Sequence, residues 1–156
     1  MWTEILDILL RVGAAFLLAL PLGWERGLTA RTAGLRTFPL VAVGACAYLL
    51  LGQHALGESA EAQARVLSGL LTGIGFVGGG AILKTERDVR GIATAASLWN
   101  TGAIGAAAAY GRYELGLILS VTNLLTLHLL RAAQRRQGSQ KNAPEKEEET
   151  PEGQDR

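Results

Sequence analysis

Groups that carry enzyme or metal chemistry are scarce in this sequence of 156 residues. It has one cysteine, Cys46, and two histidines, His54 and His128, which lie far apart along the chain. A lone thiol cannot form an internal disulfide, and two distant histidines without neighbouring cysteines do not match the ligand spacing of a zinc site. The hydrolase motifs G-x-S-x-G and H-E-x-x-H are absent as well. We therefore expect no enzymatic activity, no cofactor and no bound metal.

Acidic residues are missing from the middle of every long apolar stretch. Asp7 lies near the start of the first stretch, and Glu25 follows its end. Magnesium and calcium sites usually need several carboxylate oxygens, so the sequence gives little support to a cation pathway within one copy of the chain. Basic residues are spread over several links instead of gathering in one patch, which argues against nucleic-acid binding.

What the sequence does have is a series of long apolar runs separated by short charged links, with 49% hydrophobic residues overall. An apolar run of about 20 residues is long enough to cross a bilayer as a helix. The runs predict an all-α membrane protein with five transmembrane helices. We expect these helices at about residues 5–24, 37–56, 66–83, 91–110 and 113–136, which together form one transmembrane domain, residues 1–136. The polar residues 137–156 are expected to be a disordered tail.

The links between these predicted spans are alternately rich and poor in basic residues, so that most basic residues lie on one side of the membrane. Nine lie in the first and third links and at the end of the fifth helix, whereas only two lie on the other side. Because cytoplasmic loops are enriched in lysine and arginine, this bias predicts that the N-terminus is outside the cell and the C-terminus is in the cytoplasm. The nine are Arg26, Arg31, Arg36, Lys84, Arg87, Arg90, Arg131, Arg135 and Arg136, and the two are Arg65 and Arg112.

The run over residues 66–83 is rich in glycine and has no charge. Gly69 with Gly73, and Gly75 with Gly79, form G-x-x-x-G pairs, which allow membrane helices to approach to backbone contact. We expect this run to be the central helix, with the other helices packed against it. Part of it, residues 73–78, also matches the nucleotide-binding pattern G-x-G-x-x-G. That pattern indicates a nucleotide site only between a strand and a helix, so we interpret these residues as packing glycines.

Polar side chains occur near the middle of the fourth and fifth predicted spans. Ser97, Asn100 and Thr101 belong to the fourth, and Asn123 belongs to the fifth. The link between the two spans is very short, so the two asparagines should lie at similar depth. We predict that they hydrogen-bond, directly or through a neighbouring hydroxyl, and so join the two helices. A ligand site is the alternative interpretation.

Four ionisable residues fall at the predicted cytoplasmic ends of the helices, namely Glu25, Arg26, Arg36 and Arg90. They could pair as a network, hold anionic lipid headgroups, or be solvated residues of the positive-inside bias. A carboxylate among these arginines favours an ion pair between Glu25 and one of them.

Two pairs of segments resemble the signatures of the MgtC/SapB family of membrane proteins. The first pair is Gly23-Trp24-Glu25-Arg26 and Ala33-Gly34-Leu35-Arg36-Thr37. The second is the glycine-rich segment 73–80 followed by Val89-Arg90-Gly91 and the helix up to Trp99. The resemblance covers roughly residues 5–130. Many members also have a folded soluble C-terminal domain, which this chain replaces with a short acidic tail, so we expect regulation through such a domain to be absent.

The resemblance implies a multi-pass protein of the bacterial inner (plasma) membrane. The family is linked to magnesium homeostasis and growth in low magnesium and, in pathogens, to virulence. Its members are thought to bind and modulate other membrane proteins, including the ATP synthase, rather than to transport magnesium. The alternative is a small oligomeric transporter or channel for a cation or small solute, in which Asn100, Thr101 and Asn123 line a pore. A homo-oligomer would be compatible with either interpretation.

Overall fold

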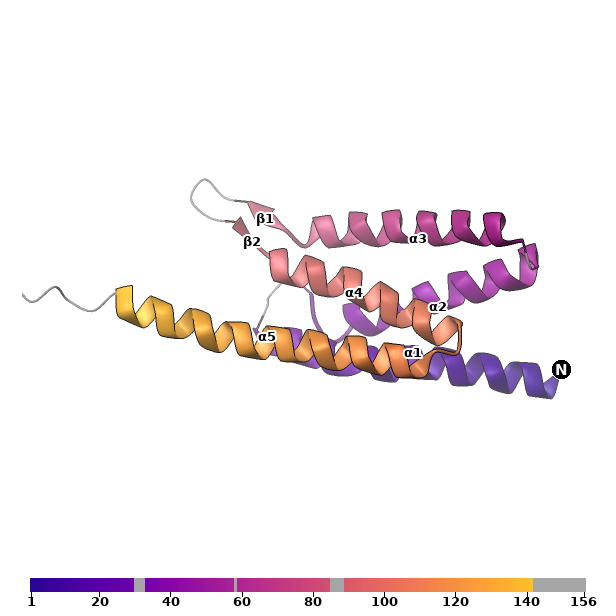
Figure 1. Ribbon diagram of the computed structural model, residues 1–156, viewed down its shortest axis with the longest axis horizontal. Helices are drawn as coiled ribbons and strands as arrows, with labels where there is room; N and C mark the ends of the chain where they lie inside the picture. The colour runs from indigo at the N-terminus through magenta and orange to yellow at the C-terminus, as the bar shows by residue number, and fades with distance from the viewer. Residues whose placement is uncertain (30–32, 58, 85–88, 142–156) are drawn as a thin grey trace, which may run out of the picture.

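The protein is a bundle of five helices that run alternately up and down (Figure 1). The computed structural model describes residues 1–29, 33–57, 59–84 and 89–141. The helices are α1 (Trp2–Thr29), α2 (Thr37–Leu56), α3 (Ala60–Gly80), α4 (Ile92–Ala109) and α5 (Tyr113–Lys141). The N-terminus and the end of α5 lie at opposite ends of the bundle. The helical fold class is thus confirmed.

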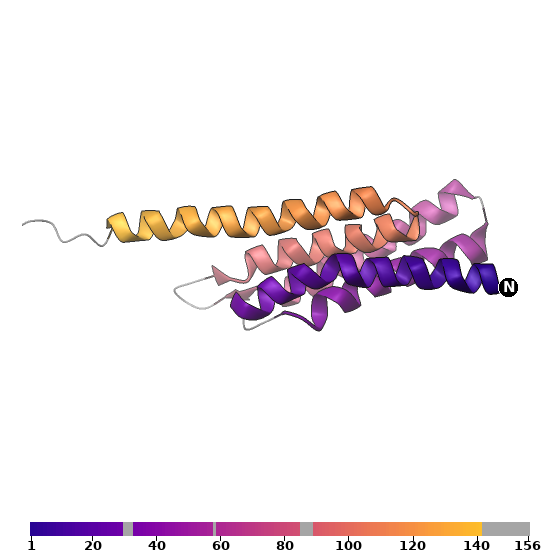
Figure 2. The same cartoon turned by 90° about the horizontal axis from the view of Figure 1, so that it is seen from below.

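The helix boundaries agree best with the sequence for α2, whose apolar run lies between Arg36 and Gly57. α2 begins and ends at the predicted residues, whereas α1, α3 and α5 extend into polar sequence that we assigned to links or tail. α5 continues to Lys141 and reaches beyond the ends of its neighbours (Figure 2). The first residues of the predicted tail are therefore helical, and residues 142–156 lie outside the described part of the chain.

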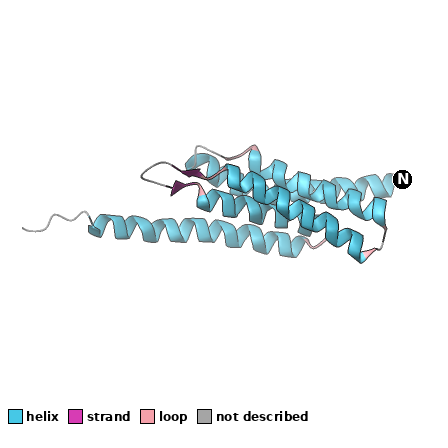
Figure 3. Cartoon of the chain, turned by 90° about the horizontal axis from the view of Figure 1, so that it is seen from above, coloured by secondary structure: helices cyan, strands magenta, loops and turns pink. Residues whose placement is uncertain are grey.

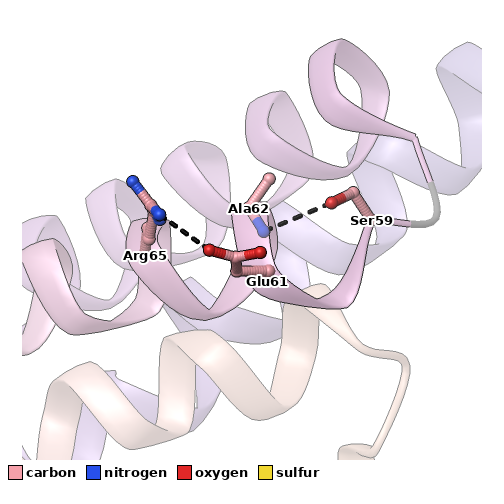
Figure 4. A network of polar contacts seen from close by, with 4 residues as sticks. All are labelled: Ser59, Glu61, Ala62 and Arg65. Atoms are coloured by element: carbon pink, nitrogen blue, oxygen red, sulfur yellow. Dashed lines mark hydrogen bonds and ion pairs between the residues drawn. The ribbon is translucent and has the colours of Figure 1, made fainter.

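The start of α3 shows why a helix can begin before its apolar run does. The hydroxyl of Ser59 accepts a hydrogen bond from the amide of Ala62, which caps the first turn. One turn further on, Arg65 forms an ion pair with Glu61 at 2.7 Å (Figure 4). These contacts satisfy the first turns of α3 with exposed polar groups, so the helix starts at Ala60.

A short β-hairpin, which the sequence did not lead us to predict, connects α3 to α4 at one end of the bundle (Figure 3). Strand β1 (Leu83–Lys84) pairs antiparallel with β2 (Val89–Arg90), with Leu83 opposite Arg90. Gly91 follows with φ of +92°, and a Cβ at this position would overlap the carbonyl oxygen of Ala81. Only glycine fits here, because the backbone is left-handed and the end of α3 lies against it.

The central helix is α4, and the prediction that the glycine-rich α3 would be central is wrong. α4 contacts α1, α2, α3 and α5, whereas α3 packs mainly on α2 and α4. Gly105 of α4 lies so close to α2 that a Cβ there would overlap the carbonyl oxygen of Ala42. Gly102 lies equally close to the side chain of Ile74. The closest helix approaches are therefore made by the glycines of α4.

Small side chains fill the interior and large apolar ones face outward. One buried cluster is built mostly from alanine, and the other combines two alanines with larger side chains such as Leu22, Phe38 and Leu98. The outer faces carry exposed large apolar side chains, including Leu17, Phe76 and Leu129. This distribution is typical of helices surrounded by lipid, where close packing rather than water exclusion joins helices. Among the described residues, Trp2–Leu28 and Thr37–Leu56 are long and apolar enough to cross a membrane by length and composition.

Candidate functional site

A polar seam joins α4 to α5 near the middle of the bundle. The hydroxyl of Ser97 donates to the side-chain oxygen of Asn123 at 3.1 Å. The amide nitrogen of Asn100 donates to the backbone carbonyl of Leu119 at 3.3 Å. Both asparagines therefore bridge the same two helices, although they bond to other groups and not to each other. Ser97 bonds to Asn123 but not to Asn100, so the predicted link between the two asparagines is replaced by two separate bonds between the helices.

Thr101 belongs to the seam by position but bonds within its own helix. Its hydroxyl donates to the backbone carbonyl of Ser97 at 2.8 Å, and the residue is fully buried. This bond satisfies the hydroxyl without a partner from another helix.

A cavity of about 280 Å³ opens beside the seam. Its lining includes the polar residues of both helices and small residues of α4. These are Ala93, Ala96, Ser97, Asn100, Leu119, Thr122, Asn123, Thr126 and Leu127. The amide nitrogen of Asn123 is buried and has no hydrogen-bond partner within the described part of the chain. Buried donors are usually hydrogen-bonded, so this nitrogen is an exception within the seam.

A buried ion pair lies at the end of the bundle where α1 finishes. The Arg26 guanidinium Nε lies 3.2 Å from a carboxylate oxygen of Glu25, and both side chains are less than a tenth exposed. This contact matches the predicted ion pair between Glu25 and a nearby arginine. Arg36, just before α2, and Arg90, just before α4, lie at the same end and are exposed. The four-residue network stays a prediction, because only its central pair is described in atomic detail.

Most glycines of α3 are exposed and do not pack against other helices of this chain; the exception is Gly78, which is buried against Ala95 of α4. A Cβ built at Gly69, Gly73, Gly75 or Gly79 would meet no atom within 4 Å. The expectation that these four glycines join helices is therefore wrong within a single copy. Gly69 and Gly73 instead line an apolar groove of about 520 Å³ between α2 and α3.

Two contacts that join α1 to α4 and α5 were not anticipated. Arg11 pairs with Asp7 at 2.7 Å, as the i, i+4 spacing suggests, and its guanidinium also donates to the backbone carbonyl of Ala109. Ser120 donates to the backbone carbonyl of Leu18 at 2.7 Å. The first contact holds the C-terminal end of α4 to α1, and the second holds α5 to α1. Sequence spacing reveals neither, because both partners are backbone atoms on a distant helix.

Comparison with known proteins places this chain among bacterial relatives of similar sequence. Residues 12–136 match the model of the MgtC family. The chain is 37% identical over 142 residues to the protein SrpB of Synechococcus elongatus, covering 83% of this chain and 78% of SrpB. It is 37% identical over 136 residues to the protein MgtC of Salmonella typhimurium, covering 87% of this chain but only 56% of MgtC.

The chain covers only part of the length of some of these relatives. Identity to YhiD of Escherichia coli K12 is 31% over 129 residues, or 79% of this chain and 60% of YhiD. The chain thus spans little more than half the length of MgtC and YhiD, although it spans more of SrpB. No solved structure matches significantly. The family match covers most of the chain, the resemblance inferred from the two signatures is confirmed, and the protein belongs to the MgtC family.

Proposed function

We propose that this protein is a multi-pass protein of the bacterial inner membrane that binds and modulates another membrane protein during magnesium-limited growth. The membrane assignment is supported by the outward-facing large apolar side chains and the alanine-rich interior. Five spans follow if lipid surrounds all five helices, with the N-terminus outside and the C-terminus in the cytoplasm. The basic residues before α2 and α4 support this orientation, since they share one end of the bundle.

The observation that carries the modulating role is how the interior polar groups are used. Asn100 bonds to α5, Ser97 to Asn123, and Ser120 to α1, so each of these groups joins one helix to another. Side chains that hold a bundle together are not free to pass an ion from site to site. The ATP synthase, suggested by the family, is the first partner to test.

Transport is the second candidate. It is favoured by the name of the relative YhiD, which provisionally describes that protein as a magnesium transporter. In this case an oligomer would line a pore with Asn100, Thr101 and Asn123. Thr101 would then have to turn from its own helix toward the pore.

Reconstituted vesicles separate the two functions. Vesicles that contain the purified protein and a magnesium-sensitive dye should take up Mg²⁺ no faster than empty vesicles. The same protein should restore growth at low magnesium to a bacterial strain that lacks its own family member, and should crosslink to ATP synthase subunits in native membranes. Saturable Mg²⁺ uptake that Asn100→Leu removes would instead establish transport.

The orientation has its own test. Alkaline phosphatase fused before residue 1 should be active, because this enzyme folds only outside the cytoplasm, and the same enzyme fused after residue 156 should be inactive. Activity at both ends would contradict the five-span arrangement.

A further inference from the structure

An apolar groove of about 520 Å³ lies between α2 and α3. Near the link that joins these helices the two walls meet, because a Cβ at Gly52 would come within 3.2 Å of the Val66 side chain. Further from the link the walls separate, because a Cβ at Gly44, Gly69 or Gly73 would meet no atom within 4 Å. We call this space the α2–α3 groove.

The length of the α2–α3 groove matches one leaflet of a bilayer. Its lining on α3 begins at Val66 and ends at Val77, which corresponds to about 16 Å at a rise of 1.5 Å per residue. A membrane-spanning helix crosses about 30 Å of hydrocarbon, so about half of it would lie outside the groove. The acyl chain of a lipid in one leaflet crosses only about 15 Å, which is half of that thickness. The groove therefore suits a lipid chain better than a helix from a partner or from a second copy.

Unpaired positive charge lies at the open end of the groove. Because α2 and α3 run in opposite directions, Arg36 before α2 and Lys84 after α3 share this end. Both are exposed, and the structure records no hydrogen bond or ion pair between either side chain and another described residue. At the closed end, Arg65 is instead paired with Glu61 at 2.7 Å. An anionic headgroup would therefore be attracted to the end where α2 begins.

The first turn of α2 favours an anion at the same place. The N-terminus of a helix carries the positive end of its dipole, and the first turn of α2 contains no acidic residue. Thr37 lies four residues before Val41, so it continues the face of α2 that lines the groove. A phosphate at this turn would lie beside Arg36 and Thr37, and a chain attached to it would lead directly into the groove.

We propose that the α2–α3 groove binds one acyl chain of an anionic phospholipid, and that Arg36, Thr37 and Lys84 hold the phosphate of this lipid. In the orientation given above, the lipid belongs to the cytoplasmic leaflet. A zwitterionic phospholipid has the same chains, but its second, positive charge offsets the attraction of the phosphate to the two basic residues. This inference goes beyond the modulating function, and it requires only that lipid surrounds the bundle.

Native mass spectrometry of the full-length protein in detergent micelles tests the proposal, because it counts the lipids that stay bound. Phosphatidylglycerol, which is anionic, and phosphatidylethanolamine, which is zwitterionic, are titrated with identical acyl chains. A basic residue near an anionic surface contributes about 1 kcal/mol, or about fivefold in affinity. With two such residues, one phosphatidylglycerol per copy should bind about 25-fold more tightly than phosphatidylethanolamine.

Leucine substitutions assign the acyl chain to the groove. Gly73→Leu places a side chain in the groove and should weaken both lipids at least fivefold. Gly44→Leu fills the groove from the opposite wall and should have the same effect, so the result does not depend on the folding of one variant. Gly75→Leu is the matched control, because it adds the same side chain to α3 in open space outside the lining. It should bind both lipids like the original protein.

Glutamine substitutions assign the headgroup. Arg36→Gln and Lys84→Gln should each lower the affinity for phosphatidylglycerol about fivefold and leave the affinity for phosphatidylethanolamine unchanged. Arg65→Gln is the control at the closed end of the groove and should change neither affinity.

Several results would overturn the proposal. Equal affinity of the original protein for the two lipids would show that the basic end does not select a headgroup. Phosphatidylglycerol binding that Gly73→Leu and Gly44→Leu leave intact would place the lipid elsewhere on the bundle. A dimer without bound lipid that these two substitutions dissociate would assign the groove to a second copy. None of these results would affect crosslinking to the ATP synthase or growth at low magnesium, so the proposed function would stand or fall separately.

Discussion

α3 and α4 both carry glycines, yet these glycines have opposite roles in the bundle. α4 lies at the centre, and its Gly102 and Gly105 allow neighbouring helices to approach until no Cβ would fit. α3 lies at the periphery, and Gly73 and Gly75 have open space where a Cβ would be. A glycine pattern therefore indicates that a close approach is sterically allowed, and tertiary contacts decide whether the chain itself makes it.

The largest difference in stability is expected when a glycine of α4 and a glycine of α3 are each replaced by leucine. Gly105→Leu drives a side chain into the backbone of α2 and should lower the free energy of unfolding by about 3 kcal/mol. Gly75→Leu on α3 should leave it unchanged, because the new side chain points into open space. Thermal unfolding of both variants in detergent checks this. If Gly75→Leu were the more destabilising change, α3 rather than α4 would be the central helix.

A smaller loss of stability is expected from removing the arginine that contacts α4, compared with removing an arginine of α3. Arg11→Leu removes the guanidinium that binds the Ala109 carbonyl at the C-terminal end of α4, and should cost about 1–2 kcal/mol. Arg65→Leu on α3 removes only an exposed ion pair with Glu61 and should have no measurable effect. The same unfolding assay compares them. Equal losses would show that the Arg11 contact adds nothing beyond an ordinary surface pair.

A third comparison concerns hydroxyls on α5. Ser120→Ala removes the hydrogen bond to Leu18 that joins α5 to α1, and should cost about 0.6 kcal/mol. Thr126→Ala is the control, because its hydroxyl bonds the Thr122 carbonyl of its own helix. Unfolding in detergent should separate the two variants by that amount. A control that is as destabilising as Ser120→Ala would argue against a role for the bond between helices.

The smallest effect is a pH dependence at the turn between α4 and α5. A hydrogen bond from Arg112 lowers the pKa of Glu114 below its ordinary value of 4.5. The stabilisation is therefore complete above about pH 4.5 and is lost as the pH falls through the lowered pKa. Because the pair is exposed, added salt should reduce the effect. Acid unfolding of the original protein is compared with that of Glu114→Gln, and the difference between the two curves is the contribution of the Arg112–Glu114 pair. Identical curves would show that the pair does not contribute.

The sequence was informative where one physical signal dominated. α2 was predicted at both ends because Arg36 and Gly57 flank its apolar run. Polar contacts between α4 and α5 were predicted because a short link places Asn100 and Asn123 at similar depth, although the two asparagines bond to other groups and not to each other. α3 was misplaced for two reasons. Its glycines satisfy the packing pattern without using it, and its first turns, capped by Ser59, are polar.

Other features depend on distant contacts that no local pattern encodes. Arg11 reaches a carbonyl 98 residues away, and Ser120 one 102 residues away. The hairpin has only two residues in each strand, too few for an alternating pattern to be recognised. That the amide nitrogen of Asn123 lacks a hydrogen-bond partner among the described residues could be found only once its neighbours were known. The asparagine itself was already a sign of a polar contact, because it lies within an apolar run.

Because α3 is only slightly buried, we expect it to open locally more readily than the other helices. Only Ile74 and Gly78 of this helix are buried, and it is fastened to the rest through the hairpin at one end and the link from α2 at the other. Local opening is governed by the contacts that must be broken, so α3 should detach while the other helices remain assembled. Its backbone amides should therefore exchange with deuterium well before those of α4. A partner protein that binds to α3 would slow the exchange of its amides. The exchange rate of α3 would then measure how much of the protein is bound to that partner.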